Sequence, residues 1–205
     1  MLTTLTCARF PHAAQSSAVT ETEEFKSLRR LALANLGRNV LHFQRLEARL
    51  KILVLFCGFE APQEQFAAAH KERTQSIRKK TMGAVVSELH EQLYGRPADP
   101  EVTKAITAAH VSFQFRVDAD PDYLDQQKKR LTDLVSERNE LIHHDLASFD
   151  PTSAGSCRHW ITRLDEQNER ILSQLKAVEQ LINTGKESFQ ILLASMNSDE
   201  YRRQL

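Results

Sequence analysis

An apolar stripe along residues 33 to 56 limits the folds open to this chain more than any other sequence feature. Its members recur every three or four positions, the spacing that places side chains on one face of an α-helix. They are Leu33, Leu36, Val40, Phe43, Leu46, Leu50, Leu53 and Phe56. A cap at Thr20 or Thr22 marks the start of the helix, and Gly58 and Pro62 mark its end. The pattern predicts a helix of about 35 residues, longer than the average helix of a globular protein.

The C-terminal part of the chain carries a second pattern of this kind, over about 156 to 183. Its apolar side consists of Trp160, Ile161, Leu164, Ile171, Leu172, Leu175, Val178, Leu181 and Ile182. Gly185 is expected to interrupt this helix before a last segment that reaches about residue 196. Because glycine and proline are scarce, at six each in 205 residues, the sequence predicts an all-α helical bundle with two long helices.

Shorter elements are predicted between the two long helices. Residues 63–80 are polar and basic, and are expected to be helical at first and exposed, whereas 81–95 predicts a short amphipathic helix. In 110–118, apolar and polar residues alternate, which predicts one short β-hairpin or an extended segment. A further helix is predicted to begin with Asp120 as its cap and to end near Pro151.

Length and composition indicate one soluble domain. We expect a single helical domain over 21–196, between a flexible N-terminal tail (1–20) and a C-terminal tail (197–205). The 27 basic and 27 acidic residues cancel, so nucleic-acid binding would need a local patch. No apolar run approaches the roughly 18 residues of a membrane span. Three scattered cysteines without CxxC spacing fit a reducing compartment, so a cytoplasmic protein without membrane contact is expected.

The sequence RNELIHHDL, which starts at Arg138, places a charge inside an apolar stripe. At about 100° per residue, Arg138 falls among the apolar side chains of this predicted helix. Burial of an unpaired guanidinium is costly, so Arg138 needs an acidic partner, a water-lined cleft or a subunit interface. Asn139 and His143 lie one turn apart on one flank of the stripe, while His144 points roughly 100° further round.

Simpler interpretations of these residues exist. Arg138 could form an interior ion pair with Asp145 or with Glu137 of a neighbour, which would leave the histidines as solvated surface. RNVLH, from Arg38 to His42, echoes the later motif with a gap one residue shorter. It is interpreted as an ordinary surface pair on the polar side of the first helix.

A zinc site is a further alternative. It would use Cys157, His159, His143 and Asp145, but no pair among them has standard ligand spacing, and adjacent histidines on a regular helix cannot face one metal. Glycine-rich phosphate loops, GxSxG and HExxH are absent from the sequence. Neither a metal nor another cofactor is therefore expected.

The arrangement of Arg138, Asn139 and His143 resembles the HEPN superfamily (higher eukaryotes and prokaryotes nucleotide-binding). Nucleases of that family carry an arginine, four to six residues, and then a histidine on a late helix of a small helical bundle. The gap of four selects His143, and a gap of five selects His144. The resemblance covers mainly residues 120–185, and it extends to small uncharacterised bacterial proteins with the same late helix.

The resemblance implies a metal-independent endoribonuclease of the toxin or phage-defence type. It also implies a homodimer whose motif helices meet across a two-fold axis and form a composite cleft. His143 would transfer a proton at the 2′-hydroxyl, Arg138 would bind phosphoryl oxygens and Asn139 would orient the phosphate or the histidine. His144 and Asp145 would support them. Implied partners are RNA, a second copy, and an antitoxin or another defence-system protein.

A basic run, HKERTQSIRKK at residues 70–80, offers secondary candidates for RNA phosphate contacts: Arg73, Arg78, Lys79 and Lys80. The ordinary role of such a run is a solvated helix face. A function of a different class is a non-catalytic helical binding or scaffold protein. It would use the face around Arg138 for dimerisation or partner docking.

Overall fold

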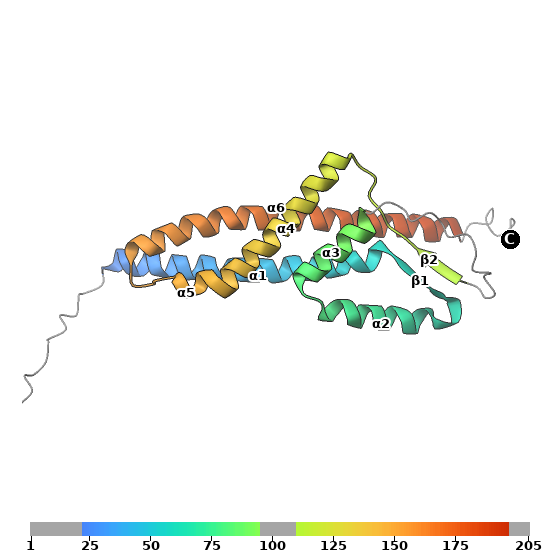
Figure 1. Cartoon of the computed structure of the whole chain (residues 1–205), viewed down its shortest axis with the longest axis horizontal. Helices are drawn as coiled ribbons and strands as arrows, with labels where there is room; N and C mark the ends of the chain where they lie inside the picture. Colours follow the sequence, from blue (N-terminus) through green and yellow to red (C-terminus); the bar gives the residue numbers. More distant parts are fainter. Residues whose placement is uncertain (1–21, 95–109, 197–205) are drawn as a thin grey trace, which may run out of the picture.

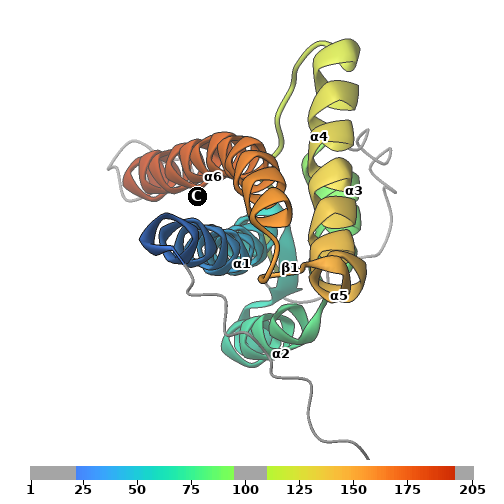
Figure 2. The same ribbon diagram turned by 90° about the vertical axis from the view of Figure 1, so that its left-hand side faces the viewer.

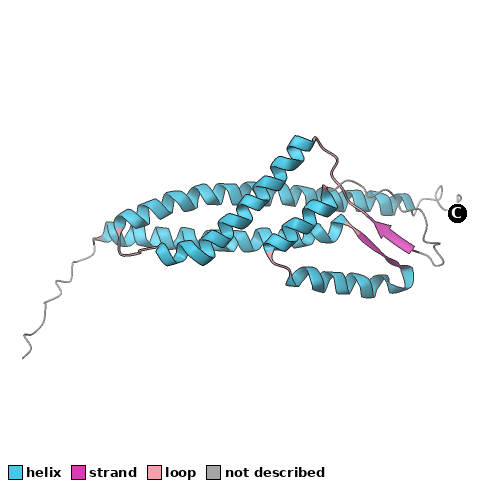
Figure 3. Cartoon of the chain, viewed as in Figure 1, coloured by secondary structure: helices cyan, strands magenta, loops and turns pink. Residues whose placement is uncertain are grey.

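The computed structural model describes residues 22–94 and 110–196, so both predicted tails, 1–20 and 197–205, lie outside the described residues. The described chain is almost entirely helical (Figures 1 and 3), which confirms an all-α bundle with two long helices. Its elements are α1 (Glu23–Cys57), β1 (Phe59–Pro62), the 3-10 helix η1 (Gln63–Gln65), α2 (Phe66–Lys79), α3 (Met82–Leu93), β2 (His110–Phe113), α4 (Pro121–Glu140), the π-helix η2 (Leu141–Asp145), α5 (Leu146–Ser148) and α6 (Ala154–Met196). No helix in these two ranges is long and apolar enough to cross a membrane.

The helix starts follow from capping residues. Thr22 accepts a hydrogen bond from the Phe25 amide at the start of α1, which confirms one of the two predicted caps. Asp120 accepts from the Asp122 amide, and Pro121 is the first residue of α4, as predicted. These local interactions fix where the helices begin, irrespective of how the helices later pack.

The two long helices lie side by side and run in the same direction (Figure 1). Ion pairs join Glu24 of α1 to Arg158 of α6, and Arg49 of α1 to Glu179 of α6. The two helices are therefore parallel. The buried positions recur every three or four residues, as in a coiled coil. They are Ala32, Asn35, Asn39, Phe43, Leu46, Leu50, Leu53 and Cys57 on α1, and Cys157, Trp160, Leu164, Gln167, Ile171, Gln174, Val178 and Ile182 on α6. In Figure 2, α3 and α4 lie side by side on one flank of this pair.

The predicted apolar stripes are wrong at several positions. Leu33 is 47% exposed and Leu172 is 44% exposed, whereas Asn35 and Asn39 are buried. In its N-terminal half, the seam between α1 and α6 is therefore partly polar. The stripe on α1 turns apolar from Phe43 onward.

Hydrogen bonds across the seam explain why these polar residues are buried. The Asn39 amide donates to the Leu164 carbonyl (2.7 Å) and to Gln167 Oε1 (3.0 Å). Arg38 pairs with Asp165 at 2.8 Å, and Nδ1 of His42 lies 2.7 Å from the amide oxygen of Asn168. A buried polar group that keeps its hydrogen bonds costs little. The interpretation of RNVLH as an ordinary surface pair is thus wrong, because its polar residues bind α6.

The predicted strand at 110–118 is confirmed over residues 110–113, which form β2. Its partner is β1, which the sequence patterns do not predict. The strands are antiparallel, with Phe59 opposite Phe113 and Pro62 opposite His110. Because α2 and α3 separate them in sequence, this two-stranded sheet is a long-range contact.

The expected interruption at Gly185 does not occur, since α6 continues to Met196. Gly185 is buried, and a Cβ at this position would lie 3.7 Å from the ring of Phe115. A glycine inside a helix costs about 1 kcal/mol relative to alanine. A Cβ at 3.7 Å would make an ordinary van der Waals contact with Phe115, which precedes α4, so this packing does not require glycine.

Because the seam is polar, replacing a polar residue of α1 should destabilise the protein more than replacing an apolar one. Asn39→Ala should lower the free energy of unfolding by about 1–3 kcal/mol, because Gln167 and the Leu164 carbonyl lose their partner in a buried place. Leu41→Ala on the same helix should change it by less than about 0.5 kcal/mol, because Leu41 is 61% exposed. Urea unfolding of both variants tests this, and a larger loss for Leu41→Ala would contradict the polar seam.

Candidate functional site

The motif predicted from the sequence lies at the C-terminal end of α4 and in the π-helix that follows. The Leu146 amide donates to the Leu141 carbonyl, five residues earlier. A π-turn has more residues than an α-turn, so each residue rotates the chain by a smaller angle. His143 and His144 are therefore rotated back toward the side of Asn139, compared with the straight helix assumed from sequence. Turns of this type occur frequently at functional sites.

Arg138 is half-buried between the buried Leu134 and Leu141. Its aliphatic stem therefore shares the apolar stripe, as predicted. Its Nη1 donates to Oδ1 of Asn139 at 3.0 Å. Within residues 22–94 and 110–196, no carboxylate forms an ion pair with Arg138. Most of the guanidinium donors are thus left for another acceptor.

The two acids proposed for an interior ion pair with Arg138 have other partners, and both partners are arginines of α6. Glu137 accepts two hydrogen bonds from Arg170, at 2.9 Å from Nε and 3.1 Å from Nη2. This is the paired geometry that guanidinium and carboxylate groups favour. Asp145 accepts from Nη2 of Arg163. The structure therefore gives no support to an intrachain ion pair of Arg138.

The pair between Asp145 and Arg163 anchors the π-helix on the N-terminal part of α6. Asp145 is buried, and the guanidinium carbon of Arg163 lies 5.5 Å from the ring centroid of Trp160. The Trp160 ring in turn packs at 5.2 Å from Phe149. Asp145, predicted as a supporting residue, is thus placed to hold the backbone of the histidine-bearing turn.

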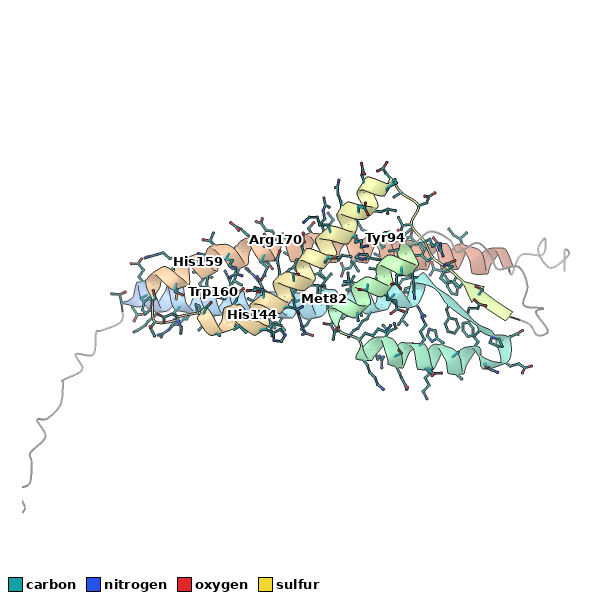
Figure 4. The ribbon with its side chains drawn as sticks, viewed as in Figure 1. Met82, Tyr94, His144, His159, Trp160 and Arg170 are labelled. Carbon is teal, nitrogen blue, oxygen red and sulfur yellow. The ribbon has the colours of Figure 1, made fainter. Side chains whose placement is uncertain are left out.

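Both predicted histidines are exposed. His143 and His144 have no hydrogen bond or ion pair with any residue of the described chain. Figure 4 shows His144 at the end of α4, with Trp160 and Arg170 on the neighbouring α6. The structure therefore collects Arg138, Asn139 and both imidazoles at one end of α4, on a turn that α6 holds in place.

The predicted RNA-binding run does not form one surface. Arg73 points inward, and its Nη2 donates to the Val54 carbonyl (3.2 Å) and to Gln92 Oε1 (2.9 Å). Lys80 pairs with Glu88 at 2.5 Å. Arg78 and Lys79 are exposed in the last turn of α2. Of the four candidates, these two are therefore available for phosphate contacts.

The alternative zinc ligands do not come together. In the two described ranges, no group of three or more His, Cys, Asp and Glu side chains could hold a metal ion. Asp145 is bound to Arg163, and the buried Cys157 thiol lies 3.9 Å from the Pro151 carbonyl oxygen.

No protein-family model, no curated protein and no solved structure matches this chain. The chemistry of the residues at the end of α4 therefore carries the functional inference. Within the described ranges, that end presents an arginine with unpaired donors and two imidazoles without a partner, which are groups suited to binding an anion and transferring protons.

Removal of the Asp145 partner should loosen the histidine-bearing turn. Arg163→Met leaves the Asp145 carboxylate without its counter-ion, and we expect a loss of about 1–2 kcal/mol in unfolding free energy. This is below the value for a fully buried pair, because the Arg163 side chain is 41% exposed. Hydrogen exchange of the amides of residues 141–148 should also become faster.

Lys129→Met is the matched control, because it removes an exposed ion pair between Lys129 and Asp133, both on α4. It should change the unfolding free energy by less than about 0.5 kcal/mol. If exchange at 141–148 is the same in the wild type and in Arg163→Met, the pair does not hold the π-helix.

Proposed function

We propose that this chain is a cytoplasmic, metal-independent endoribonuclease of the HEPN type, with a role in toxin or phage-defence systems. The observation that carries the proposal is the set of contacts that Arg138 makes. Its guanidinium contacts Asn139 alone among the described polar groups, while two acids close in sequence, Glu137 and Asp145, are neutralised by α6. A phosphate that approaches Arg138 thus meets a cation that neither Glu137 nor Asp145 occupies.

Arg138 is suited to the transition state of phosphodiester cleavage. Negative charge gathers on the phosphoryl oxygens as the 2′-hydroxyl attacks the adjacent phosphorus. A planar guanidinium can donate to two of these oxygens at once. Asn139, bound to Arg138 through its carbonyl oxygen, keeps its amide N–H groups free to donate to the same phosphate.

His143 is proposed as the general base. It would take the proton from the 2′-hydroxyl, and the new bond from that oxygen to phosphorus would displace the 5′-oxygen of the next nucleotide. A second imidazole would protonate this leaving oxygen. His144, or an imidazole from a second copy of the chain, could supply that proton. The products are a 2′,3′-cyclic phosphate and a free 5′-hydroxyl, and neither water nor a metal ion enters the step.

A homodimer would complete this site. The motif lies at an exposed end of α4, so two-fold pairing of these ends would bring two copies of Arg138 and His143 to one groove. A groove with two guanidinium groups would attract RNA locally although the chain as a whole has equal numbers of acidic and basic residues. An antitoxin or a defence-system partner would then act by covering this groove.

Cleavage of RNA in EDTA tests the mechanism. We expect the wild-type protein to be active with chelator present, and His143→Ala and Arg138→Ala each to lose at least about 100-fold in rate, the size expected for a general base or an oxyanion-binding group. His159→Ala, which removes an exposed imidazole of α6, is the control and should remain active. Equal rates for all variants, or activity that disappears with EDTA, would refute this mechanism.

A non-catalytic binding or scaffold protein is the second candidate function. It is favoured by Leu146, an apolar residue directly after the histidine-bearing turn whose surface is 40% exposed. The same end of α4 would then serve dimerisation or partner docking.

Light scattering with Arg138→Leu separates the two candidates. If the end of α4 serves docking or dimerisation alone, the variant removes a charge from an apolar contact, and the folded protein should form a tighter dimer. No change in RNA cleavage should accompany it. If the end of α4 is a nuclease site, the same variant loses cleavage whatever its oligomeric state.

A further inference from the structure

A cavity of about 590 Å³ lies between the end of α1, helix α2, the end of α3 and the two-stranded sheet. Its size is within the range of small-molecule sites. We propose that this cavity binds one unstacked nucleobase that bears an exocyclic amino group, with the ribose and any phosphate outside. The proposal does not depend on the proposed cleavage, because no residue of α4 or of the π-helix lines the cavity.

Two phenyl rings on neighbouring strands supply apolar walls. Phe59 of β1 and Phe113 of β2 both line the cavity and lie opposite each other in the sheet. Each ring is fixed by another: Phe59 packs edge-on to Phe66, with centroids 4.9 Å apart, and Phe113 packs edge-on to Phe189 at 5.2 Å. Fixed aromatic rings suit a flat base, because every base can stack through its π-face.

Arg73 supplies a hydrogen-bond donor. It lines the cavity, and its Nη1 forms no hydrogen bond within the described chain. Its Nη2 is already used by the Val54 carbonyl and by Gln92, so the guanidinium is held in one orientation. A ring nitrogen or a carbonyl oxygen of a base would accept from Nη1.

A carboxylate selects the other half of the hydrogen-bonding edge. Glu72 lines the cavity and can accept from an amino group, while its charge disfavours a phosphate inside. The charge of Arg73 is partly offset by Glu88, 3.8 Å away, so the cavity has no excess of positive charge. An acceptor beside an exocyclic amine is the pattern of adenine, cytosine and guanine. Uracil and hypoxanthine lack that amine.

Nucleoside titrations of the full-length protein, followed by ¹H–¹⁵N NMR, test the inference. Adenosine and cytidine should give saturable shifts of amides around the cavity. Uridine and inosine should bind at least about tenfold more weakly, because a site built for an amino donor leaves polar groups unpaired with them. Adenosine 5′-monophosphate should bind no more tightly than adenosine.

Three variants make the test specific. Glu72→Gln, at an exposed position of α2, should weaken adenosine binding by about tenfold, because the charged acceptor is lost. Ser112→Trp should narrow the cavity with a bulky indole and weaken adenosine binding. Ser27→Trp, at an exposed position of α1 outside the cavity, is the matched control and should bind like the wild type.

The proposal fails if adenosine gives no saturable shifts with the wild-type protein, if uridine binds equally well, or if Glu72→Gln binds adenosine as tightly as the wild type. His143→Ala separates this proposal from the proposed function. It should bind adenosine like the wild type even though its RNA cleavage is lost.

Discussion

The parallel packing of α1 on α6 determines where the rest of the described chain lies. Parallel neighbours require the chain to return along the pair between them, and α2 and α4 run in that return direction (Figure 1). The buried amide of Asn39, bound to Gln167 and the Leu164 carbonyl, disfavours slippage, since a shifted register would leave these polar groups unpaired. Polar contacts therefore fix the register of α1 against α6, which apolar contacts alone would specify less strictly.

This alignment also positions the candidate site. Arg163 and Arg170 are seven residues apart on α6, about two helical turns. Their partners Asp145 and Glu137 are eight residues apart on the α4 side, where the π-turn contains more residues per turn. The two ion pairs thus hold the motif at both ends. A slipped register of α6 would break both pairs together and expose the buried Asp145 carboxylate without a partner.

Sequence patterns predicted the features of this fold that depend on neighbouring residues. The caps Thr22 and Asp120 were found because a cap and its helix are adjacent in the chain. The failures concern distant residues. The apolar stripe did not anticipate that Asn39 would find its partners on α6, and the glycine rule did not anticipate that Gly185 would receive the ring of Phe115.

The candidate site shows the same division between features set by neighbouring residues and contacts between distant ones. The grouping of Arg138, Asn139 and His143 followed from their spacing on one helix. The roles of Arg163 and Arg170 did not, because the choice of partner depends on how α4 crosses α6. The π-turn also has no sequence mark, as residues 141–145 contain neither glycine nor proline.

The chain contains two arginine–asparagine pairs, so the contacts of Arg138 can be compared with those of Arg38. In both, the arginine donates to the following asparagine, at 3.2 Å for Arg38 and at 3.0 Å for Arg138. Arg38 continues to Asp165 and to the Leu164 carbonyl, so its donors serve the seam of α1 and α6.

Arg138 has none of these further contacts among the described residues, although Glu137 and Asp145 are close in sequence and both bind arginines. A half-buried stem with an accessible head is a stable arrangement for arginine, because the apolar carbons pack while the charge stays hydrated. The α6 arginines neutralise Glu137 and Asp145, so neither of these acids pairs with Arg138, whose charge has no counter-ion among the described residues.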